Sequence, residues 1–342
     1  MTLKDVILCP AGEGRGLYLV FDWAEFELSE ILKTHREKKE GLDEKGVKSI
    51  MWQILNGIAF LHQNWVIHRD LKPANILIMG KGPAGQSGRV RIADFGMARL
   101  FQQPLRSLHS DGVVVTVWYR APELLLGAKH YSKAIDMWAI GCIFGELLTK
   151  PPGPLFQGVE EKHHFQKDQL VKIFNVVGKP TPEDWRQISQ LHEWHRVTSM
   201  ELDPSKITSL ENKIEVLKNP NNAHALDLIK SFFHYDPAQR MTALKAIKHK
   251  YFTDTFDFNP NCVWRTPPST AGLDIKYYPE RPLTQVGMHG QSMGPAGAAS
   301  SAHYNNNAHK RAAPGGKCLC VCLRTRAYVY EHVCGIVQQR CC

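Results

Sequence analysis

The chain has 342 residues, enough for one large domain or two small ones, and its 43% apolar and 22% charged residues are ordinary for a globular protein. The formal net charge of +9 favours acidic or phosphorylated partners but is equally compatible with a basic tail. The start shows no signal-peptide pattern and no apolar run is long enough for a membrane span, which argues against secreted and membrane-spanning classes.

The first predicted elements are a glycine-rich turn, a strand and two helices. The stretch GEGRG, residues 12–16, precedes an apolar run at 17–21 that predicts a buried strand. Such glycine-rich turns can hold phosphates with backbone N–H groups, so this one raises the question of a nucleotide-binding loop. Residues 27–40 have helical character, and residues 43–63 predict an amphipathic helix. Its apolar face contains Val47, Ile50, Met51, Ile54, Leu55, Ile58 and Leu61.

The middle of the chain alternates short strands with helices. Strands are predicted at 75–79 and 89–94, on either side of a turn-rich loop. Residues 132–148 are apolar on almost every side, which predicts a helix at the centre of the fold. Residues 168–178 predict an amphipathic helix that stops at Gly178.

Two further helices are predicted before the composition changes. One begins with Thr181 as its N-cap and Pro182 at its first position, and the other spans 241–252 with Thr242 as its N-cap. Residues 284–317 are rich in Gly, Ala, Ser and Asn. They contain too few large apolar side chains to offset the entropy of ordering, which predicts a disordered linker.

Three motifs occur in an informative order: VIHRDLKPANILI at 66–78, ADFG at 93–96 and APE at 121–123. Together they resemble the catalytic loop, the metal-binding loop and the end of the substrate platform of protein kinases. The resemblance covers residues 1–252. It implies an α+β, protein-kinase-like fold made mainly of the helical large lobe, with the last strands and the hinge of the small lobe and that lobe otherwise missing.

The resemblance assigns a role to each polar residue of these motifs. Asp70 would accept the proton of the substrate hydroxyl, and Lys72 would neutralise charge on the transferred phosphoryl group. Asn75 and Asp94 would hold Mg²⁺ against the phosphates of ATP. Thr116 completes the expected catalytic set, and the lysine in DLKPAN is the serine/threonine-kinase pattern.

The residues around the first strand resemble the adenine-binding side of a kinase. Phe21 would guard the back pocket, and Asp22 and Ala24 would offer backbone hydrogen bonds to adenine. Leu77 would lie under the adenine ring, with Asp94 beyond it at the phosphates.

Several other motif positions are expected to be structural. His68 and Phe95 would pack to hold the loops, and Glu123 and Arg240 resemble the family's buried ion pair. Cys142, in the apolar helix, is expected to act as a small apolar filler.

The glycine-rich stretch does not match the phosphate loop of the family. That loop needs G-x-G-x-x-G followed by a lysine on the next strand. Here the last glycine position is Leu17, and Lys33 lies in the helical stretch. We therefore expect the glycines to form a hairpin turn between two strands. We also expect an N-terminally truncated chain that starts after the phosphate loop, the strand lysine and the cyclin-facing helix of the family, and that has little or no kinase activity as written.

The sequence also resembles one subgroup of the family. VVVTVWYRAPELLLG is similar to the segment of cyclin-dependent kinases that prefers proline after the target Ser or Thr. Together with residues 68–80 and 167–185, it resembles the Mediator-complex kinase that pairs with cyclin C. This implies a nuclear enzyme with Mediator kinase-module subunits as partners. Its implied substrates are RNA polymerase II C-terminal repeats and transcription factors, without sequence-specific nucleic-acid binding.

One regulatory position departs from the usual pattern of cyclin-dependent kinases. Asp111 stands five residues before Thr116, where most of them carry an activating threonine. We expect its fixed negative charge to face Arg69 and Arg99 in place of a phosphate. The alternative is that Asp111 caps a turn before Gly112.

The expected organisation is a kinase domain at 1–252, an extended arm at 253–283, the linker at 284–317 and a tail at 318–342. Three scattered cysteines before the tail fit a reducing compartment, and six of the nine cysteines crowd into the tail. The tail could carry lipid sites, bind metal, or arise from read-through. The alternative function is a catalytically silent isoform that acts as an interaction protein.

Overall fold

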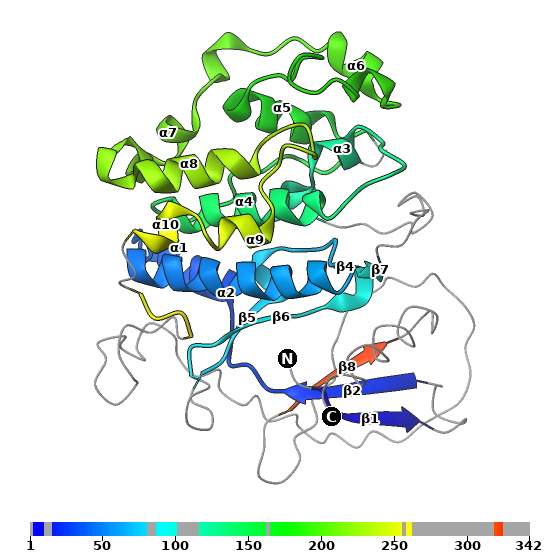
Figure 1. The fold of residues 1–342 in the computed structure, drawn as a ribbon, viewed down its shortest axis with the longest axis vertical. Helices are drawn as coiled ribbons and strands as arrows, with labels where there is room; N and C mark the ends of the chain where they lie inside the picture. Colours follow the sequence, from blue (N-terminus) through cyan, green and yellow to red (C-terminus); the bar gives the residue numbers. More distant parts are fainter. Residues whose placement is uncertain are drawn as a thin grey trace, which may run out of the picture.

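The computed structural model describes residues 3–9, 16–80, 87–100, 116–161, 165–254, 258–261 and 318–323. Most of these residues form a helical body, and a small sheet of three strands lies at the opposite end of the molecule (Figure 1). The long helix α2 crosses the middle of the molecule between them (Figure 1). Among the described residues, no helix combines the length and apolar character that crossing a membrane requires.

The helices of the body are α1 Leu28–Glu37, α2 Glu44–Gln63, α3 Pro122–Leu125, α4 Ala134–Leu148, α5 Lys167–Val177, α6 Trp194–Thr198, α7 Leu210–Lys213, α8 Ala223–Phe232, α9 Ala243–Ala246 and α10 Lys250–Thr253. Short 3₁₀ turns connect them: η1 Pro73–Asn75, η2 Phe95–Met97, η4 Val117–Tyr119, η5 Ile188–Gln190, η6 Pro204–Lys206, η7 Glu215–Lys218 and η8 Pro220–Asn222.

The two principal helices form as the sequence predicts. Asp43 caps α2 by accepting a hydrogen bond from the Gly46 backbone N–H at 3.3 Å. The apolar face of α2 is buried, except that Leu61 at its end is partly buried. In α4, only Leu148 is not fully buried, so this helix forms the centre of the core. Trp138 of α4 is fully buried, and its ring lies 4.9 Å from that of Phe233.

The strands form three separate sheets. They are β1 Leu3–Cys9, β2 Gly16–Asp22, β3 Phe26–Glu27, β4 Val66–Ile67, β5 Ile76–Ile78, β6 Val90–Ile92, β7 Arg99–Leu100 and β8 Cys318–Leu323. Their orders are β1-β2-β8, β3-β5-β6 and β4-β7, with antiparallel pairing throughout.

The glycine-rich stretch lies between two paired strands, as expected. β1 and β2 pair antiparallel with Leu8 opposite Leu17, while the turn at 10–15 lies outside the described residues. The other edge of β2 pairs with β8, where Val20 faces Cys320. This pairing was not predicted, because the tail had no sequence feature that linked it to β2. The expected linker and most of the arm lie outside the described residues.

The prediction of a helix that begins after Thr181 is wrong. Asp184 accepts hydrogen bonds from the Thr181 backbone N–H at 2.9 Å and from its hydroxyl at 3.0 Å, which closes a single turn. Trp185 then packs into the core in a non-helical conformation. The chain therefore satisfies its polar groups locally instead of propagating a helix.

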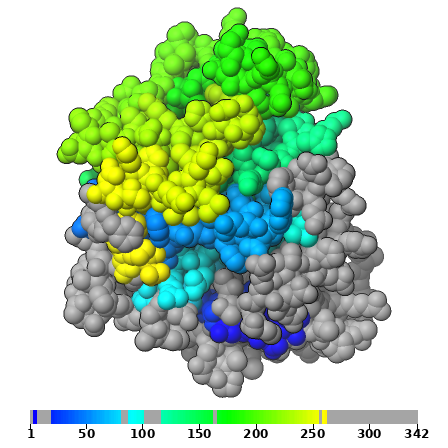
Figure 2. All heavy atoms as spheres, viewed as in Figure 1, coloured from blue at the N-terminus to red at the C-terminus, as the bar shows by residue number. Residues whose placement is uncertain are grey.

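The single helix predicted at 241–252 is two short helices. Thr242 caps α9 by accepting from the Lys245 N–H, as expected. His249 then takes an extended conformation, and its ring accepts a hydrogen bond from the Tyr251 N–H at 3.1 Å to start α10. Figure 2 shows α9 and α10, in yellow, covering one side of α2, in blue, and α9 contacts α2 directly.

Candidate active site

The loop between β4 and β5 brings three predicted site residues together. Asp70 and Asn75 are buried, and Lys72 is partly exposed. The Lys72 Nζ lies 2.8 Å from Asp70 Oδ2, and the Asn75 amide donates to the same oxygen at 3.1 Å. The Asn75 amide also donates to the Asp70 backbone carbonyl at 2.7 Å. The carboxylate is therefore held in one orientation by two side chains of its own loop.

A buried carboxylate on α4 fixes the backbone of this loop. Asp136 accepts hydrogen bonds from the N–H groups of His68 and Arg69, both at 2.9 Å. Its Oδ2 also lies 2.8 Å from the His62 ring. Burial alone would raise the pKa of Asp136, but the His62 hydrogen bond and nearby positive charge outweigh it, so that this pKa is lowered. We did not predict this role, although an aspartate in an otherwise apolar helix is a signal for it.

The two expected packing residues join this loop to the ADFG segment. The His68 ring lies 3.0 Å from the Ala93 carbonyl oxygen and 5.2 Å, between centroids, from the Phe95 ring. The prediction that these two side chains hold the loops is therefore confirmed. Their contacts place Asp94, between Ala93 and Phe95, beside the loop that carries Asp70.

The two predicted metal ligands carry oxygen atoms that suit Mg²⁺. The Asn75 amide nitrogen is committed to Asp70, so its carbonyl oxygen is the atom left for a cation. Asp94 has an exposed side chain and left-handed backbone, and its Oδ1 accepts from the Gly96 N–H at 3.1 Å. The described residues contain no group of three or more His, Cys, Asp or Glu that could hold a metal ion.

The predicted adenine-binding residues lie on neighbouring segments. Phe21 and Asp22 end β2, and Ala24 belongs to the short connection into β3. Leu77 of β5 is buried and pairs with Glu27 of β3, so it lies one strand away from that connection. The Asp22 carboxylate binds Lys4 of β1 at 3.1 Å, which ties the hairpin to the start of the connection.

Thr116 lines a hollow at the start of η4. A cavity of about 560 Å³ is lined by Thr116, Val117, Trp118 and residues 157–160. The Trp118 indole N–H donates to the Gly158 carbonyl at 2.7 Å, which holds the two walls together. Burial lowers the pKa of Arg120, in the same segment, although the nearby negative charges of Glu160 and Asp70 oppose this shift.

The predicted regulatory residues are only partly described. Arg69 has a left-handed backbone, and its guanidinium donates to the Tyr131 hydroxyl at 2.9 Å. Arg99 donates to the Ala98 carbonyl at 3.1 Å. Asp111 lies outside the described residues, so the expectation that its charge faces these arginines stays a prediction.

The expected ion pair braces the segment after Thr116. The Arg240 guanidinium binds both oxygens of Glu123, at 2.8 and 3.0 Å, and also donates to the Ala134 carbonyl. Both side chains are buried, and the arginine lies 5.2 Å from the Trp138 ring centroid. This bidentate pair confirms the predicted structural role. Cys142 is fully buried in α4, and burial raises the pKa of its thiol, as expected of a packing residue.

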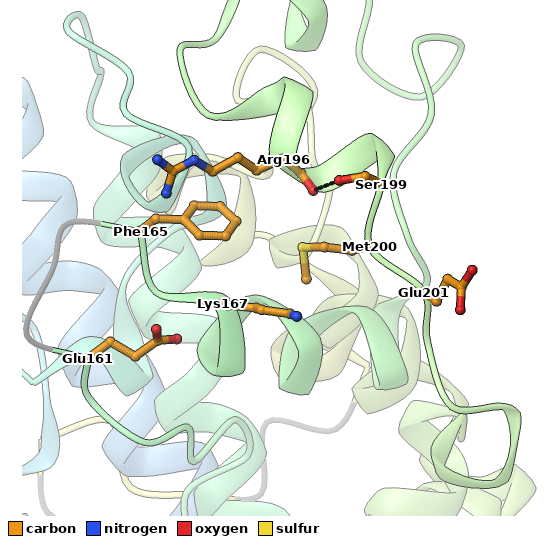
Figure 3. A pocket seen from close by; sticks show the side chains of 7 residues that line it. All are labelled: Glu161, Phe165, Lys167, Arg196, Ser199, Met200 and Glu201. Atoms are coloured by element: carbon orange, nitrogen blue, oxygen red, sulfur yellow. Dashed lines mark hydrogen bonds between the residues drawn. The ribbon is translucent and has the colours of Figure 1, made fainter.

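A second hollow, lined by none of the predicted site residues, lies between α5 and α6 (Figure 3). The Arg196 guanidinium lies 5.1 Å from the Phe165 ring centroid, and Ser199 donates to the Arg196 carbonyl. Glu161 and Lys167 line the same hollow and carry opposite charges. It contains no group that links it to the loop of Asp70, so we leave it outside the candidate site.

Comparison with known proteins supports a common origin for this arrangement. Residues 10–252 match the protein kinase domain. The chain is 50% identical over 279 residues to probable cyclin-dependent kinase 8 of Dictyostelium discoideum, which covers 80% of this chain and 70% of that protein. It is 50% identical over 242 residues to cyclin-dependent kinase E-1 of Arabidopsis thaliana, and the match covers 69% of this chain and 50% of that protein.

A third similar protein is cyclin-dependent kinase 8 of Drosophila melanogaster, which is 46% identical over 265 residues, covering 74% of this chain and 57% of that protein. The matched region therefore spans between 50% and 70% of the length of these three relatives.

Proposed function

Because the chain belongs to the protein kinase family, in the group of cyclin-dependent kinase 8, we propose that it phosphorylates Ser or Thr followed by Pro in regulators of RNA polymerase II transcription. The observation that carries the proposal is the convergence of Lys72 and Asn75 on one oxygen of Asp70. That geometry suits a carboxylate that must be held in one orientation toward a substrate hydroxyl.

In this proposal Asp70 accepts the proton of the substrate hydroxyl as its oxygen attacks the γ-phosphorus. Lys72, 2.8 Å from Asp70, stabilises the negative charge that develops on the transferred group. Asn75 orients the base and, with Asp94, offers oxygens to Mg²⁺. MgATP, when bound, supplies the phosphoryl group and neutralises its charge. Phe21, Asp22, Ala24 and Leu77 would surround the adenine.

The proposed partners follow from the group to which the chain belongs. We propose a cyclin of the cyclin C type and the kinase-module subunits of Mediator as partners, and a nuclear location. RNA polymerase II C-terminal repeats and transcription factors are the proposed substrates. Thr116 and the adjoining hollow would receive the residue that follows the target Ser or Thr.

The test is phosphate transfer from labelled ATP, with a cyclin C-type cyclin, by this chain joined to the phosphate-loop lobe of a cyclin-dependent kinase 8 relative, because we expect little transfer by the chain as written. Two peptides that differ only in Ser-Pro against Ser-Ala serve as substrates. We expect the Ser-Pro peptide to react at least about tenfold faster, the effect of roughly 1.4 kcal/mol of differential binding. Equal rates would refute the proline preference. No transfer to either peptide, with cyclin binding intact, would favour the alternative of a catalytically silent interaction protein.

A further inference from the structure

Helix α4 carries a second buried carboxylate that the mechanism above does not use. Glu146 lies roughly 15 Å further along the helix axis than Asp136, given a rise of about 1.5 Å per residue. Its side chain is 3% exposed. Its Oε2 accepts a hydrogen bond from the Tyr119 hydroxyl at 2.7 Å, and its Oε1 lies 3.3 Å from Arg36 Nη2. Glu146 therefore joins three elements that are far apart in sequence.

The contact with Tyr119 reaches the segment that borders the hollow beside Thr116. Tyr119 ends η4, directly after Val117 and Trp118, both of which line that hollow. We call residues 116–120 the substrate platform. Because η4 packs against α4, the Tyr119 hydroxyl is a polar tether between the substrate platform and the central helix.

The contact with Arg36 reaches helix α1. Arg36 is in the last turn of α1, the helix that follows β3 and packs against η1, where Asn75 lies. Its Nε donates to the Pro152 carbonyl at 2.6 Å, so the guanidinium is held in place independently of Glu146. One carboxylate thus connects α1 and the substrate platform through α4.

The electrostatic balance of Glu146 depends on these partners. Burial raises the pKa of Glu146, whereas the Tyr119 hydrogen bond and the Arg36 charge lower it. The thiol of Cys142, on the same helix, is neutral because burial and Glu146 raise its pKa. The pKa of Tyr119 is raised by burial and by Glu146, so its hydroxyl stays a donor. Arg36 is the cation that offsets the buried carboxylate, and a buried charge without its partner is costly.

We propose that Glu146 is a positioning residue that holds the substrate platform at a fixed place relative to the loop of Asp70, with Arg36 as its counter-charge. The two buried carboxylates of α4 then have complementary roles. Asp136 holds the loop that carries Asp70, and Glu146 holds the substrate platform. The inference rests on the proposed function, because a substrate platform has a task only in a protein kinase.

The first test uses the chain joined to the phosphate-loop lobe of a cyclin-dependent kinase 8 relative, with its cyclin and the Ser-Pro peptide. Tyr119→Phe removes one hydrogen bond to a charged group, so we expect the peptide KM to rise about tenfold while the ATP KM changes less than about twofold. Glu146→Gln keeps an acceptor for Tyr119 and should raise the peptide KM less than about threefold. Tyr235→Phe is the matched control, since it loses a buried hydroxyl bond to the Gly178 carbonyl, away from Glu146. We expect it to leave both KM values unchanged.

A second test uses pH. Loss of the Arg36 charge should raise the pKa of Glu146 further, because that charge lowers it in the unaltered chain. As pH rises, the carboxyl of Glu146 then ionises and becomes a buried charge without a counter-charge. In Arg36→Met, we expect the peptide KM to increase several-fold as pH rises through the folded pKa of Glu146, which burial holds above its ordinary value of 4.5, and to increase less in the unaltered chain. Arg36→Met combined with Glu146→Gln should remove the pH dependence. A flat profile in Arg36→Met would refute the counter-charge role.

Hydrogen exchange separates failure of this inference from failure of the proposed function. In Tyr119→Phe, the backbone amides of residues 117–120 should exchange about tenfold faster, while those of residues 66–78 should not change. This result would support the tether even if no phosphate were transferred. Unchanged exchange, or equal rises in the peptide and ATP KM values, would overturn the positioning role.

Discussion

Among the described residues, Lys72 and Asn75 donate the side-chain hydrogen bonds to the Asp70 carboxylate, and both lie within five positions of it in the chain. Lys72 and Asn75 reach the same oxygen, so the other carboxylate oxygen is the one left to meet a substrate hydroxyl. At the residue scale, this local arrangement made the site predictable, because the short motif contains both the base and the groups that orient it. The roles of Asp136 and Glu146 were not predicted, because both residues lie on a helix that is distant in sequence from the motif.

Replacing the base tests its role. Asp70→Asn should lower the rate of phosphate transfer by about 10²–10⁴-fold, the usual contribution of a general base, while nucleotide affinity stays within about twofold. Single-turnover kinetics and nucleotide titration measure the two quantities. Asp203→Asn, an exposed carboxylate in η6's cap, is the control and should react normally. An equal loss of nucleotide affinity would show that Asp70 acts on ATP instead.

A second residue-scale prediction concerns activation. Asp111→Ala should reduce activity by about tenfold if its charge makes one charge-assisted hydrogen bond to Arg69 or Arg99. Treatment with a kinase that activates cyclin-dependent kinases should change nothing, because position 111 has no hydroxyl. The assay is peptide phosphorylation with phosphate mapping. A large rise in activity with phosphate at Thr116, Ser110 or Ser107 would contradict the prediction.

At the scale of elements, the long periodic segments were predictable and the short ones were not. α2 and α4 have apolar patterns that only one arrangement can bury, so their bounds agree with expectation to within a few residues. The turn at Thr181 and the break at His249 depend on single side-chain hydrogen bonds that compete with helix propagation. The pairing of β2 with β8 joins residues some three hundred positions apart, which periodicity alone does not encode.

The segment after α10 gives an element-scale prediction. Phe258 is buried against Trp52 of α2 and Phe252 of α10, at centroid distances of 5.8 and 6.0 Å, and the Ser49 hydroxyl donates to the Asn259 carbonyl. Phe258→Ala should lower the free energy of unfolding by about 3 kcal/mol, because it leaves a cavity on α2. Urea unfolding measures this change.

The control for that change is Leu244→Ala on α9, where the side chain is 49% exposed. We expect it to cost less than about 1 kcal/mol, since little apolar surface is lost from the core. Equal effects of the two substitutions would show that residues 258–261 add nothing specific to the packing of α2.

For the whole molecule, the two carboxylates of α4 predict opposite pH dependences of stability. The folded pKa of Asp136 is below its ordinary value of 3.8, so its contribution is present above that pH and is lost as pH falls through the lower folded value. The folded pKa of Glu146 is above 4.5, so its contribution is largest below that pH and declines as pH rises through the folded value.

Urea midpoints measured between about pH 3 and pH 8 check this prediction. Asp136→Asn should reduce the loss of stability at acid pH and leave the decline above about pH 4.5 in place. Glu146→Gln should reduce that decline and leave the acid loss in place. The same profile in both variants as in the unaltered chain would show that other groups govern the pH dependence.

The enclosure of α4 also bears on how the molecule acquires its active loop during folding. The N–H groups of His68 and Arg69 find their acceptor only when Asp136 is inside the assembled core. Core formation and loop formation are then one cooperative event. A partly folded intermediate that lacks α4 would also lack the geometry of Asp70. These two amides should therefore belong to the slowest-exchanging class, released only by global unfolding.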